Sequence, residues 1–350
     1  MKKYRVGVLG ATGAVGQQFL NLLNGHPWFE VVAVAASSRS AGKKYLDATG
    51  WLLPGEPPRW LEDMVVQECT PGDELDFVFP GLDSTVAGEI EWRFAQNDIP
   101  VISNARNYRM NPLVPLLIPE VNPEHIQLIP AQKKKHGFRR GFLVTNPNCA
   151  TVGLVLGLFP LWRSLGIEKI VVTTMQAISG AGYPGVPALD IEGNVLPFIP
   201  NEADKIQSEP GKILGQIVDG QLVHAKIRIS AQCNRVPVRD GHLLSVSLKL
   251  KKRASRDEIV ATYREFTSPL SEWNLPSAPL HPVVFVDEPL RPQPQRDAFR
   301  DGGMAVTVGQ LSPCEVLDWR LVILVHNTIR GAAGGAILNA EWLHVNGLLR

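Results

Sequence analysis

The sequence predicts an α/β protein of two domains, in which a doubly wound parallel sheet precedes an α+β domain with a mixed sheet. Two patterns support this prediction. Strand-like and helix-like segments alternate through residue 103, and strands with alternating polar and apolar residues dominate after residue 169. The length of 350 residues also favours two domains, because single hydrophobic cores are commonly smaller.

The first strand, residues 4–9, runs directly into three regularly spaced glycines. Gly10, Gly13 and Gly16 form G-x-x-G-x-x-G, and an apolar helix follows. Glycines let such a turn tighten, and the N-terminus of the next helix can receive a pyrophosphate. Because the turn follows a strand and opens a helix, it predicts a Rossmann-type dinucleotide-binding domain.

The second strand, residues 31–36, should end beside the adenosine ribose of a bound dinucleotide. A site that prefers NAD commonly carries an acidic residue there, but this strand is followed by Ser37-Ser38-Arg39-Ser40. Arg39 with hydroxyls beside it suits a 2′-phosphate, so the sequence favours NADP over NAD. The alternative is a polar loop that faces solvent.

The α/β alternation continues with two strands and a helix between them, at residues 76–80, 100–103 and 87–96. After the second of these strands, Arg106 and Arg109 are candidate oxyanion binders, unless they face water. The basic run 133–140 is expected to be a solvated loop.

Cys149 lies where a strand turns into a helix. The apolar segment 142–144 is broken by Asn-Pro-Asn, and residues 150–165 have the pattern of a buried helix. A helix start presents unpaired N–H groups and a partial positive charge, which favour a thiolate over a thiol. Asn148 is expected to add a side-chain donor next to the sulfur, which makes Cys149 the candidate nucleophile. The alternative is a small buried cysteine in the first turn of a helix.

Residues 169–177 alternate as a strand that ends in a Gly-rich turn, 179–185. Such a turn lets the backbone approach a ligand closely. Farther along, Glu209 and Lys212 place opposite charges three residues apart near an expected helix start. Their alternative interpretation is a surface ion pair of little energetic worth.

His242 is the candidate acid/base. Gly241 precedes it and allows a turn that could bring the imidazole into a cleft, with Arg235 nearby. Cys233 is a rival nucleophile, but it lies in an extended segment with no helix start behind it. It therefore ranks below Cys149.

The remaining segments predict a mixed sheet with helices on one face. Residues 243–250 alternate, which favours an antiparallel strand with one buried face. Two further strands are expected at residues 304–310 and 319–325. A helix capped by Ser255 is expected at residues 255–266, and a rigid extended loop at residues 289–296. The tail from residue 326 is expected to be a helix that returns to the first domain.

Composition excludes several classes of protein. The net charge is +1, so nothing points to nucleic acid or to an anionic membrane. No apolar run reaches transmembrane length. The four cysteines are far apart in the sequence, which argues against a disulfide framework or a zinc site and favours a cytoplasmic protein.

Taken in order, the motifs resemble one known family. They are G-A-T-G-A-V-G, S-S-R-S-A-G-K-K-Y, N-P-N-C-A-T, Q-A-I-S-G-A-G, C-N-R-V-P-V-R-D-G-H and H-N-T-I-R-G-A-A-G. Over nearly its full length the chain resembles aspartate-semialdehyde dehydrogenases, in the branch found in archaea and fungi. No single motif is specific, but their order and spacing are.

The resemblance implies residue roles. Cys149 would be the nucleophile, His242 the acid/base, and Gln176 would orient a thioester intermediate. Arg235 would clamp the substrate α-carboxylate, and Glu209 would take its ammonium group. Phosphate would be held by Asn148, Arg109 and Lys212; the Glu209 and Lys212 assignments rest partly on the spacing in the bacterial branch. The implied NADP contacts are Gly10, Thr12, Gly13, Ala14, Val15, Ser37, Arg39, Ser40, Ser179, Gly180 and Asn327, and no metal is implied.

The implied reaction is the reversible, NADPH-dependent reductive dephosphorylation of L-aspartyl 4-phosphate to L-aspartate 4-semialdehyde, a step toward lysine, threonine and methionine. Cysteine suits this chemistry, because a thioester is reactive enough to take hydride or phosphate. The expected domains are 1–148 for NADP binding and 149–328 for catalysis and dimerisation, with 329–350 packing back onto the first. The resemblance also implies a homodimer or homotetramer built on the second domain.

Two alternatives are weighed against this function. Archaeal malonyl-CoA reductases are similar across most of the chain, but Asn148 and the Asn234-Arg235 pair favour a phosphorylated amino-acid substrate. The other alternative is a non-catalytic NADP-binding sensor that kept the fold.

Overall fold

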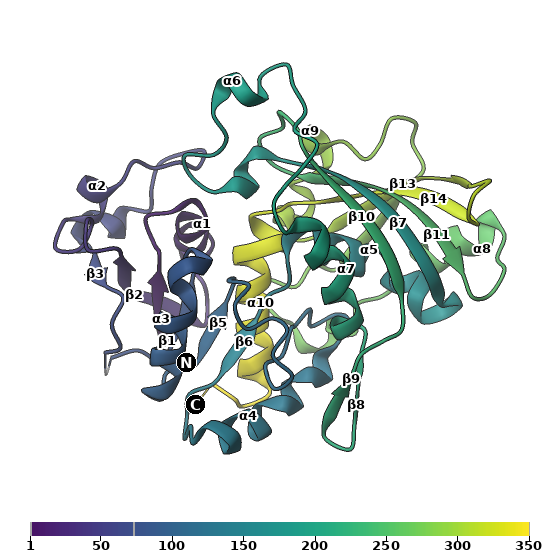
Figure 1. Cartoon of the computed structure of the whole chain (residues 1–350). Coiled ribbons are helices and arrows are strands. Elements are labelled where there is room, and N and C mark those ends of the chain that lie inside the picture. The colour runs from purple at the N-terminus through teal and green to yellow at the C-terminus, as the bar shows by residue number, and fades with distance from the viewer. Residues whose placement is uncertain (1, 73, 350) are drawn as a thin grey trace.

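The computed structural model describes residues 2–72 and 74–349, and two sheets divide the chain into two lobes (Figure 1). Met1, Asp73 and Arg350, which the expected domain ranges include, lie outside the described residues. Both expected sheet types are present, so the predicted fold class is confirmed.

The first sheet has six parallel strands in the order β3-β2-β1-β4-β5-β6. They are β1 (Tyr4–Leu9), β2 (Phe29–Ala36), β3 (Gln67–Glu68), β4 (Phe77–Pro80), β5 (Val101–Ser103) and β6 (Leu143–Thr145). The helical segments of this lobe are α1 (Ala14–Leu22), α2 (Tyr45–Ala48), η1 (Arg59–Asp63), α3 (Ser84–Gln96), η2 (Pro123–Gln127) and α4 (Leu128–His136). The strand order reverses direction between β1 and β4, and ligands of doubly wound sheets bind at the carboxyl ends of strands beside such a point.

The glycine turn between β1 and α1 leaves no room for a side chain at positions 10 and 16. Gly10 has φ +73°, and a Cβ there would lie 2.6 Å from the carbonyl oxygen of Gly81. A Cβ on Gly16 would lie 2.2 Å from the carbonyl oxygen of Gly10. The glycines therefore close the turn and bring the start of α1 against the carboxyl end of β1.

The second sheet is mixed, in the order β10-β7-β11-β14-β13-β12. Its strands are β7 (Ile167–Gln176), β10 (Arg228–Arg235), β11 (His242–Leu250), β12 (Val283–Val286), β13 (Val306–Pro313) and β14 (Trp319–Val325). β7 pairs parallel with β10 and β12 with β13, whereas β11 pairs antiparallel with both β7 and β14. The segments between them include η3 (Ile178–Ala181), α6 (Ala188–Ile191), β8 (Gln216–Val218), β9 (Gln221–Val223), η4 (Ser271–Trp273), α9 (Pro294–Asp297) and η5 (Arg300–Gly303).

Helices cover one face of the mixed sheet. They are α5 (Cys149–Leu165), α7 (Glu202–Ile213) and α8 (Arg256–Arg264), and α5 contacts β7, β11, β13 and β14. The strands alternate accordingly: Val172 and Val246 are buried under α5, while Val171 on the opposite face is half exposed. The predicted Ser255 cap is confirmed, because Ser255 forms a capping box with Glu258 at the start of α8.

The C-terminal segment crosses back to the first lobe. After β14, a short π-helical turn, η6 (Ile329–Ala333), leads into α10 (Gly334–Val345). Ile337 and Leu338 of α10 are fully buried in the same apolar cluster as Val6 and Phe79 of the parallel sheet. Both ends of the described chain thus meet in the first lobe (Figure 1).

Three local expectations differ from the structure. The basic run 133–140 begins within α4 and is a loop only in its second half, because apolar Leu128 and Ile129 anchor the helix. Glu209 and Lys212 lie near the end of α7, not its start. The segment 289–296 is not extended throughout, since Pro294 begins the short helix α9. Within the described residues, no helix combines the length and apolar character that crossing a membrane would need.

Candidate active site

Cys149 is the first residue of α5, directly after β6, as its sequence context predicts. Asn148 caps the helix: its Oδ1 accepts the backbone N–H groups of Ala150 (3.0 Å) and Thr151 (3.1 Å). The remaining N–H of this first turn, that of Cys149 itself, is not among the hydrogen bonds formed by the described residues. The expectation that Asn148 donates to the sulfur is wrong, because its Nδ2 donates to Glu202 Oε1 at 2.7 Å.

His242 reaches Cys149 from the first position of β11. Its Nε2 lies 3.2 Å from the Cys149 sulfur, and its Nδ1 accepts the backbone N–H of Ala177 at 3.1 Å. Gly241 has φ +97°, which turns the chain into β11, and its N–H donates to Asn327 Oδ1 at 2.9 Å. Two segments far apart in sequence therefore hold the imidazole against the thiol.

The surroundings shift the pKa values of both the thiol and the imidazole toward the neutral forms. Burial raises the pKa of Cys149 to about 12, and the charge of Glu202 adds to the shift; Arg109, Lys205 and the N–H of Ala150 oppose it. Burial also lowers the pKa of His242 to about 3. The helix start acts in the expected direction, because the N–H of Ala150 lowers the Cys149 pKa, but desolvation is the larger effect and opposes the expected thiolate.

Glu202, at the start of α7, is the acidic group of this site, and sequence reasoning missed it. It is buried, and its carboxylate accepts from Asn148 Nδ2, from Gln176 Nε2 at 3.1 Å and from Lys205 Nζ at 2.8 Å. Burial raises its pKa, but Lys205 and the two amides outweigh that effect and lower it overall, so Glu202 is ionised.

Glu209 and Lys212 lie seven residues farther along α7 than Glu202 and Lys205, and their polar atoms are hydrogen-bonded to other partners. Glu209 accepts from Arg109 Nη1 at 3.0 Å and from the N–H of Asn148 at 2.7 Å. Lys212 is fully buried, and its Nζ donates to the carbonyl oxygens of Arg109 (2.6 Å), Asn111 (2.7 Å) and Val114 (2.7 Å). With all three N–H donors in use, Lys212 has none left for a phosphate. The available signal was that E-x-x-K occurs twice on one helix face, at 202–205 and at 209–212.

Arg235 and Gln176 end neighbouring strands, β10 and β7, and are paired in register. Arg235 is buried, and its Nη1 donates to the carbonyl oxygen of Ala177 at 2.8 Å. A Cβ on Gly180 would lie 3.0 Å from Cε1 of His242 and 3.1 Å from Nη1 of Arg235. Gly180 therefore packs directly over the catalytic candidates.

The η6 turn closes the site behind the sulfur. A Cβ on Gly331 would lie 2.6 Å from the Cβ of Cys149. The neighbouring Arg330 is fully buried and makes a two-pronged ion pair with Glu120, with both N–O distances at 2.7 Å. That pair anchors the turn to the first lobe.

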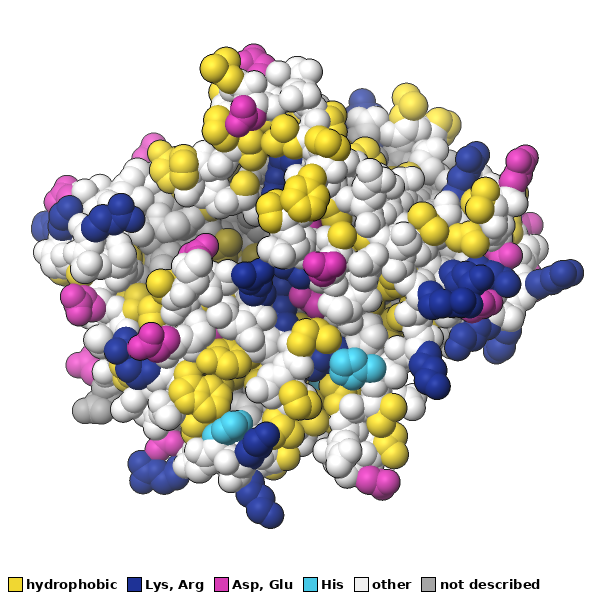
Figure 2. Space-filling model, viewed as in Figure 1, with side chains coloured by type: hydrophobic (Ala, Val, Ile, Leu, Met, Phe, Trp, Pro, Cys, Tyr) yellow, Lys and Arg dark blue, Asp and Glu magenta, His cyan; other side chains and the backbone are white. Residues whose placement is uncertain are grey.

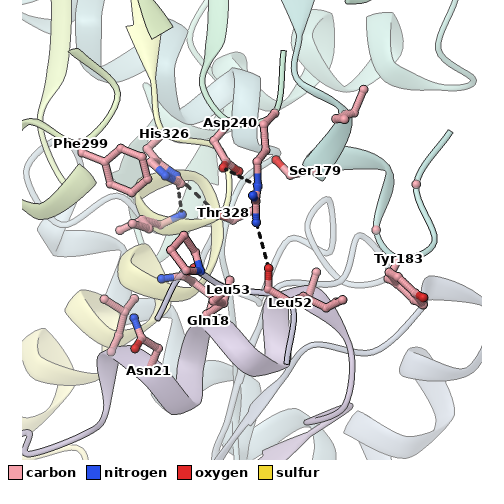
Figure 3. Close-up of a pocket in the computed structure, with 18 of the residues that line it drawn as sticks. Gln18, Asn21, Leu52, Leu53, Ser179, Tyr183, Asp240, Phe299, His326 and Thr328 are labelled. Atoms are coloured by element: carbon pink, nitrogen blue, oxygen red, sulfur yellow. Dashed lines mark hydrogen bonds and ion pairs between the residues drawn. The ribbon is translucent and has the colours of Figure 1, made fainter. Parts of the chain in front are cut away.

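A cleft of about 450 Å³ lies between the two lobes (Figure 3). Its lining includes Ile178 and Ser179, which directly follow the residue whose N–H donates to His242, but not Cys149 or His242 themselves. It is lined by α1 residues, among them Ala14 and Gln18, and by second-lobe residues that include Ser179, Asp240 and His326. In the space-filling view, a hollow runs between the lobes, and charged side chains gather near its centre (Figure 2). Within the described residues, no group of three or more His, Cys, Asp or Glu is placed to hold a metal ion.

The residues predicted for the cofactor lie in three places, and two of these residues, Ala14 and Ser179, line this cleft. Gly10, Thr12, Gly13, Ala14 and Val15 form the turn at the start of α1, and Ser37, Arg39 and Ser40 follow β2. Ser179, Gly180 and Asn327 lie on the second lobe, where Asn327 Nδ2 donates to Ser179 Oγ at 2.8 Å. The narrow glycine turn, which a Cβ would fill, fits the close approach of a pyrophosphate.

Comparison with known proteins places both lobes in one family. Residues 5–129 match the model of the "Semialdehyde dehydrogenase, NAD binding domain", and residues 158–330 match the "Semialdehyde dehydrogenase, dimerisation domain". The second match indicates a homo-oligomer. Aspartate-semialdehyde dehydrogenase of Aspergillus fumigatus is 46% identical over 358 residues, covering 99% of both chains. The enzyme of Archaeoglobus fulgidus is 46% identical over 340 residues, covering 97% of both.

A solved structure of aspartate semialdehyde dehydrogenase with NADP from Candida albicans superposes with a TM-score of 0.90 at 43% identity. The match covers 99% of this chain and 100% of that one. Nearly half identical to such relatives from end to end, and folded in the same way, this chain belongs to the aspartate-semialdehyde dehydrogenase family.

Proposed function

We propose that this protein catalyses the aspartate-semialdehyde dehydrogenase reaction, the interconversion of L-aspartyl 4-phosphate and L-aspartate 4-semialdehyde, through a thioester on Cys149. The observation that carries the proposal is the 3.2 Å contact between the Cys149 sulfur and His242 Nε2 at the start of a helix beside the interlobe cleft. A nucleophilic sulfur there can lie next to both an acyl substrate and a dinucleotide.

Substrate recognition is assigned to residues that converge on the sulfur. Arg235 keeps Nη2 and Nε beyond its bond to Ala177, so it can clamp the substrate α-carboxylate. Glu202 is ionised and buried, and we assign it the α-ammonium group in place of Glu209. Lys205, whose side chain is partly exposed, takes the phosphate in place of Lys212, and Arg109, whose charge acts on Cys149, is kept as its second cation.

The chemistry follows from these positions. The Cys149 sulfur attacks the acyl carbon; the S–C bond forms as the C–O bond to phosphate breaks, and phosphate leaves with the electron pair. The cofactor supplies a hydride to the thioester carbon. The C–S bond then breaks, its electrons return to sulfur, and the semialdehyde is released. The N–H of Cys149, which no other group of the described residues accepts, would stabilise the oxyanion of each tetrahedral state, and Gln176 orients the Glu202 carboxylate by donating to its Oε1.

We assign NADP as the cofactor. The glycine turn at α1 would hold the pyrophosphate, and Arg39 with Ser37 and Ser40 would hold the 2′-phosphate. Ser179, Gly180 and Asn327 would lie at the nicotinamide end, beside Cys149. The Candida albicans relative, which is 43% identical, was solved with NADP.

For assembly, we propose a homodimer or homotetramer built on the second domain. Val171, on the face of the mixed sheet opposite α5, is half exposed, and exposed apolar side chains also lie on α6 and just after it, among them Leu189 and Phe198. Apolar atoms also gather on the protrusion that carries α6 (Figures 1 and 2). The proposal keeps the domain limits 1–148, 149–328 and 329–350, and a cytoplasmic location, which suits four free thiols.

The test is phosphate-dependent reduction of NADP by aspartate semialdehyde. Purified protein should turn over with phosphate and stall without it, and Cys149→Ser should lose turnover while keeping NADP binding. Full activity of Cys149→Ser would contradict the thioester, whereas NADP binding without any turnover of the wild-type protein would favour the non-catalytic sensor. Parallel assays with malonyl-CoA test the malonyl-CoA reductase alternative, which predicts that malonyl-CoA replaces aspartyl phosphate as the substrate reduced by NADPH.

A further inference from the structure

We propose that the interlobe cleft is a second position for the nicotinamide ring of the cofactor, withdrawn from Cys149, and that Asp240 and Gln18 recognise the oxidised ring there. The proposal rests on the assignment of NADP as the cofactor and adds to it a position away from the reacting sulfur. The oxidised ring carries a positive charge and a carboxamide group, whereas the reduced ring carries the carboxamide without the charge.

The cleft begins at residues assigned to the cofactor and leads away from the sulfur. It is lined by Ala14, at the turn that would hold the pyrophosphate, and by Ser179, at the nicotinamide end. Cys149 and His242 are not part of the lining, so a ring in the cleft is not placed to transfer a hydride to a carbon on Cys149. Gln18 lies four residues after Ala14 on α1, which is about 6 Å at the rise of an α-helix. A ring on the ribose arm of the cofactor therefore reaches it while the pyrophosphate stays in place.

Two buried side chains of the cleft have hydrogen-bonding groups that no described residue uses. Gln18 is 6% exposed, and its side-chain amide makes no hydrogen bond within the described chain. His326 is 2% exposed; its Nδ1 accepts the N–H of Ile329 at 3.3 Å, and its Nε2 has no partner among the described residues. Figure 3 shows the two side chains on opposite sides of the cleft. An unpaired buried polar group costs free energy, and a carboxamide, with an acceptor oxygen and a donor nitrogen, would offset that cost.

The cleft also has a negative charge for a cationic ring. Asp240 lines it, and no hydrogen bond from the described part of the chain reaches its carboxylate. The nearby cation is Arg239, but its Nε lies 3.7 Å from Asp240 Oδ2, and its Nη2 donates to the carbonyl oxygen of Leu52 at 2.9 Å. Phe299 lines the same cleft and is 59% exposed, and an aromatic face attracts a cation. These groups favour the oxidised ring over the reduced one.

The remaining walls and the volume suit a flat ring. Leu53, Pro54 and Ile329 provide apolar walls, and about 450 Å³ falls within the range of small-molecule sites. A ring held there leaves Cys149 open to the acyl substrate and to phosphate. The cleft thus separates the oxidised ring from the sulfur before the cofactor dissociates.

Binding of the two redox forms tests the recognition. Asp240→Asn should weaken NADP⁺ binding about tenfold, the effect of one partly screened charge pair, and change NADPH binding by less than about twofold. Gln18→Leu should weaken both forms about fivefold, because each carries the carboxamide that loses a hydrogen bond. Isothermal titration calorimetry gives the dissociation constants. Equal weakening of the two forms by Asp240→Asn would overturn the proposal.

ADP-ribose 2′-phosphate, which is NADP without its nicotinamide ring, is the ligand control. Its affinity should be the same in the wild-type protein and in both variants, because it lacks the group that enters the cleft. Weaker binding of this compound in the variants would also overturn the proposal, since the substitutions would then act on the rest of the cofactor site. Asp257→Asn on α8 and Gln216→Leu on β8 are matched exposed substitutions and should alter none of the three affinities.

Alkylation of Cys149 by iodoacetamide distinguishes the cleft from the position beside the sulfur. Saturating NADPH should slow the reaction, whereas saturating NADP⁺ should leave it close to the rate of the cofactor-free protein. In Asp240→Asn, NADP⁺ should protect Cys149 as well. Equal protection by the two forms in the wild-type protein would overturn the second position. That result would leave the proposed function standing, because phosphate-dependent turnover tests the Cys149 thioester separately.

Discussion

Gly331 packs so tightly on Cys149 that a Cβ at position 331 would lie 2.6 Å from the cysteine Cβ. Gly331→Ala must therefore push the sulfur away from His242. We expect kcat to fall by about 100-fold, the usual effect of misplacing a reacting atom by about 1 Å. Gly50→Ala is the matched control, because a Cβ there would meet nothing within 4 Å. Steady-state kinetics of both variants check this, and wild-type kcat in Gly331→Ala would contradict the packing.

Substitution of the lysine in each of the two E-x-x-K pairs on α7 should have different effects, one on phosphate binding and the other on stability. Lys205→Met should raise KM for phosphate about tenfold and destabilise the fold by only about 1 kcal/mol, since its side chain is partly exposed and Glu202 keeps its two amide donors. Lys212→Met should instead destabilise the fold by about 3 kcal/mol, because three buried carbonyl groups lose their donor. Phosphate titrations and chemical unfolding of the two variants separate these outcomes. The assignment would be reversed if Lys212→Met were stable and weak in phosphate binding.

Alkylation of Cys149 should rise steadily with pH. Burial raises the pKa of Cys149 to about 12, so the iodoacetamide rate should grow about tenfold per pH unit from about pH 7 to about pH 10, whereas the rate of an ordinary thiol levels off near its own pKa of about 8.5. The charge of Glu202 raises that pKa, so Glu202→Gln should lower it and speed alkylation at fixed pH while slowing turnover. Mass spectrometry of the labelled peptide reports both rates. Slower alkylation in Glu202→Gln is the result that would refute this electrostatic account.

The Arg330–Glu120 pair should matter far more than an exposed ion pair. Arg330→Met leaves a fully buried carboxylate without its partner, and we expect a loss of about 3–5 kcal/mol in the free energy of unfolding. Arg228→Met removes an exposed pair with Glu168 and should change it by less than about 1 kcal/mol. Denaturant titrations of the two variants give the comparison, and equal effects would mean that the η6 anchor is not structural.

Cofactor preference should depend on Arg39. Arg39→Ala removes an exposed guanidinium beside the expected 2′-phosphate, so KM for NADPH should rise about tenfold while KM for NADH stays the same. Lys43→Ala, a change of equal charge four residues later, is the control and should leave the ratio of the two KM values unaltered. A parallel rise in both KM values after Arg39→Ala would argue against selection of the phosphate.

The sequence by itself determined the features that depend on neighbours along the chain. The glycine turn before α1, the switch from strand to helix at Cys149, the turn before His242 and the alternating strand β11 were all predictable, because turn chemistry and hydrophobic periodicity are local. The family followed from the order of such motifs.

Only the tertiary structure decided which acidic residue lies near the Cys149 sulfur and how the pKa of that cysteine is shifted. Glu202 and Glu209 are seven residues apart on one helix face, so their local pattern is the same. Which of the two carboxylates lies near Cys149 depends on the position of α7 along its own axis relative to the site, and tertiary packing sets that position. The protonation of Cys149 likewise depends on burial by segments far away in the chain, and that desolvation outweighs the helix start that the sequence made visible.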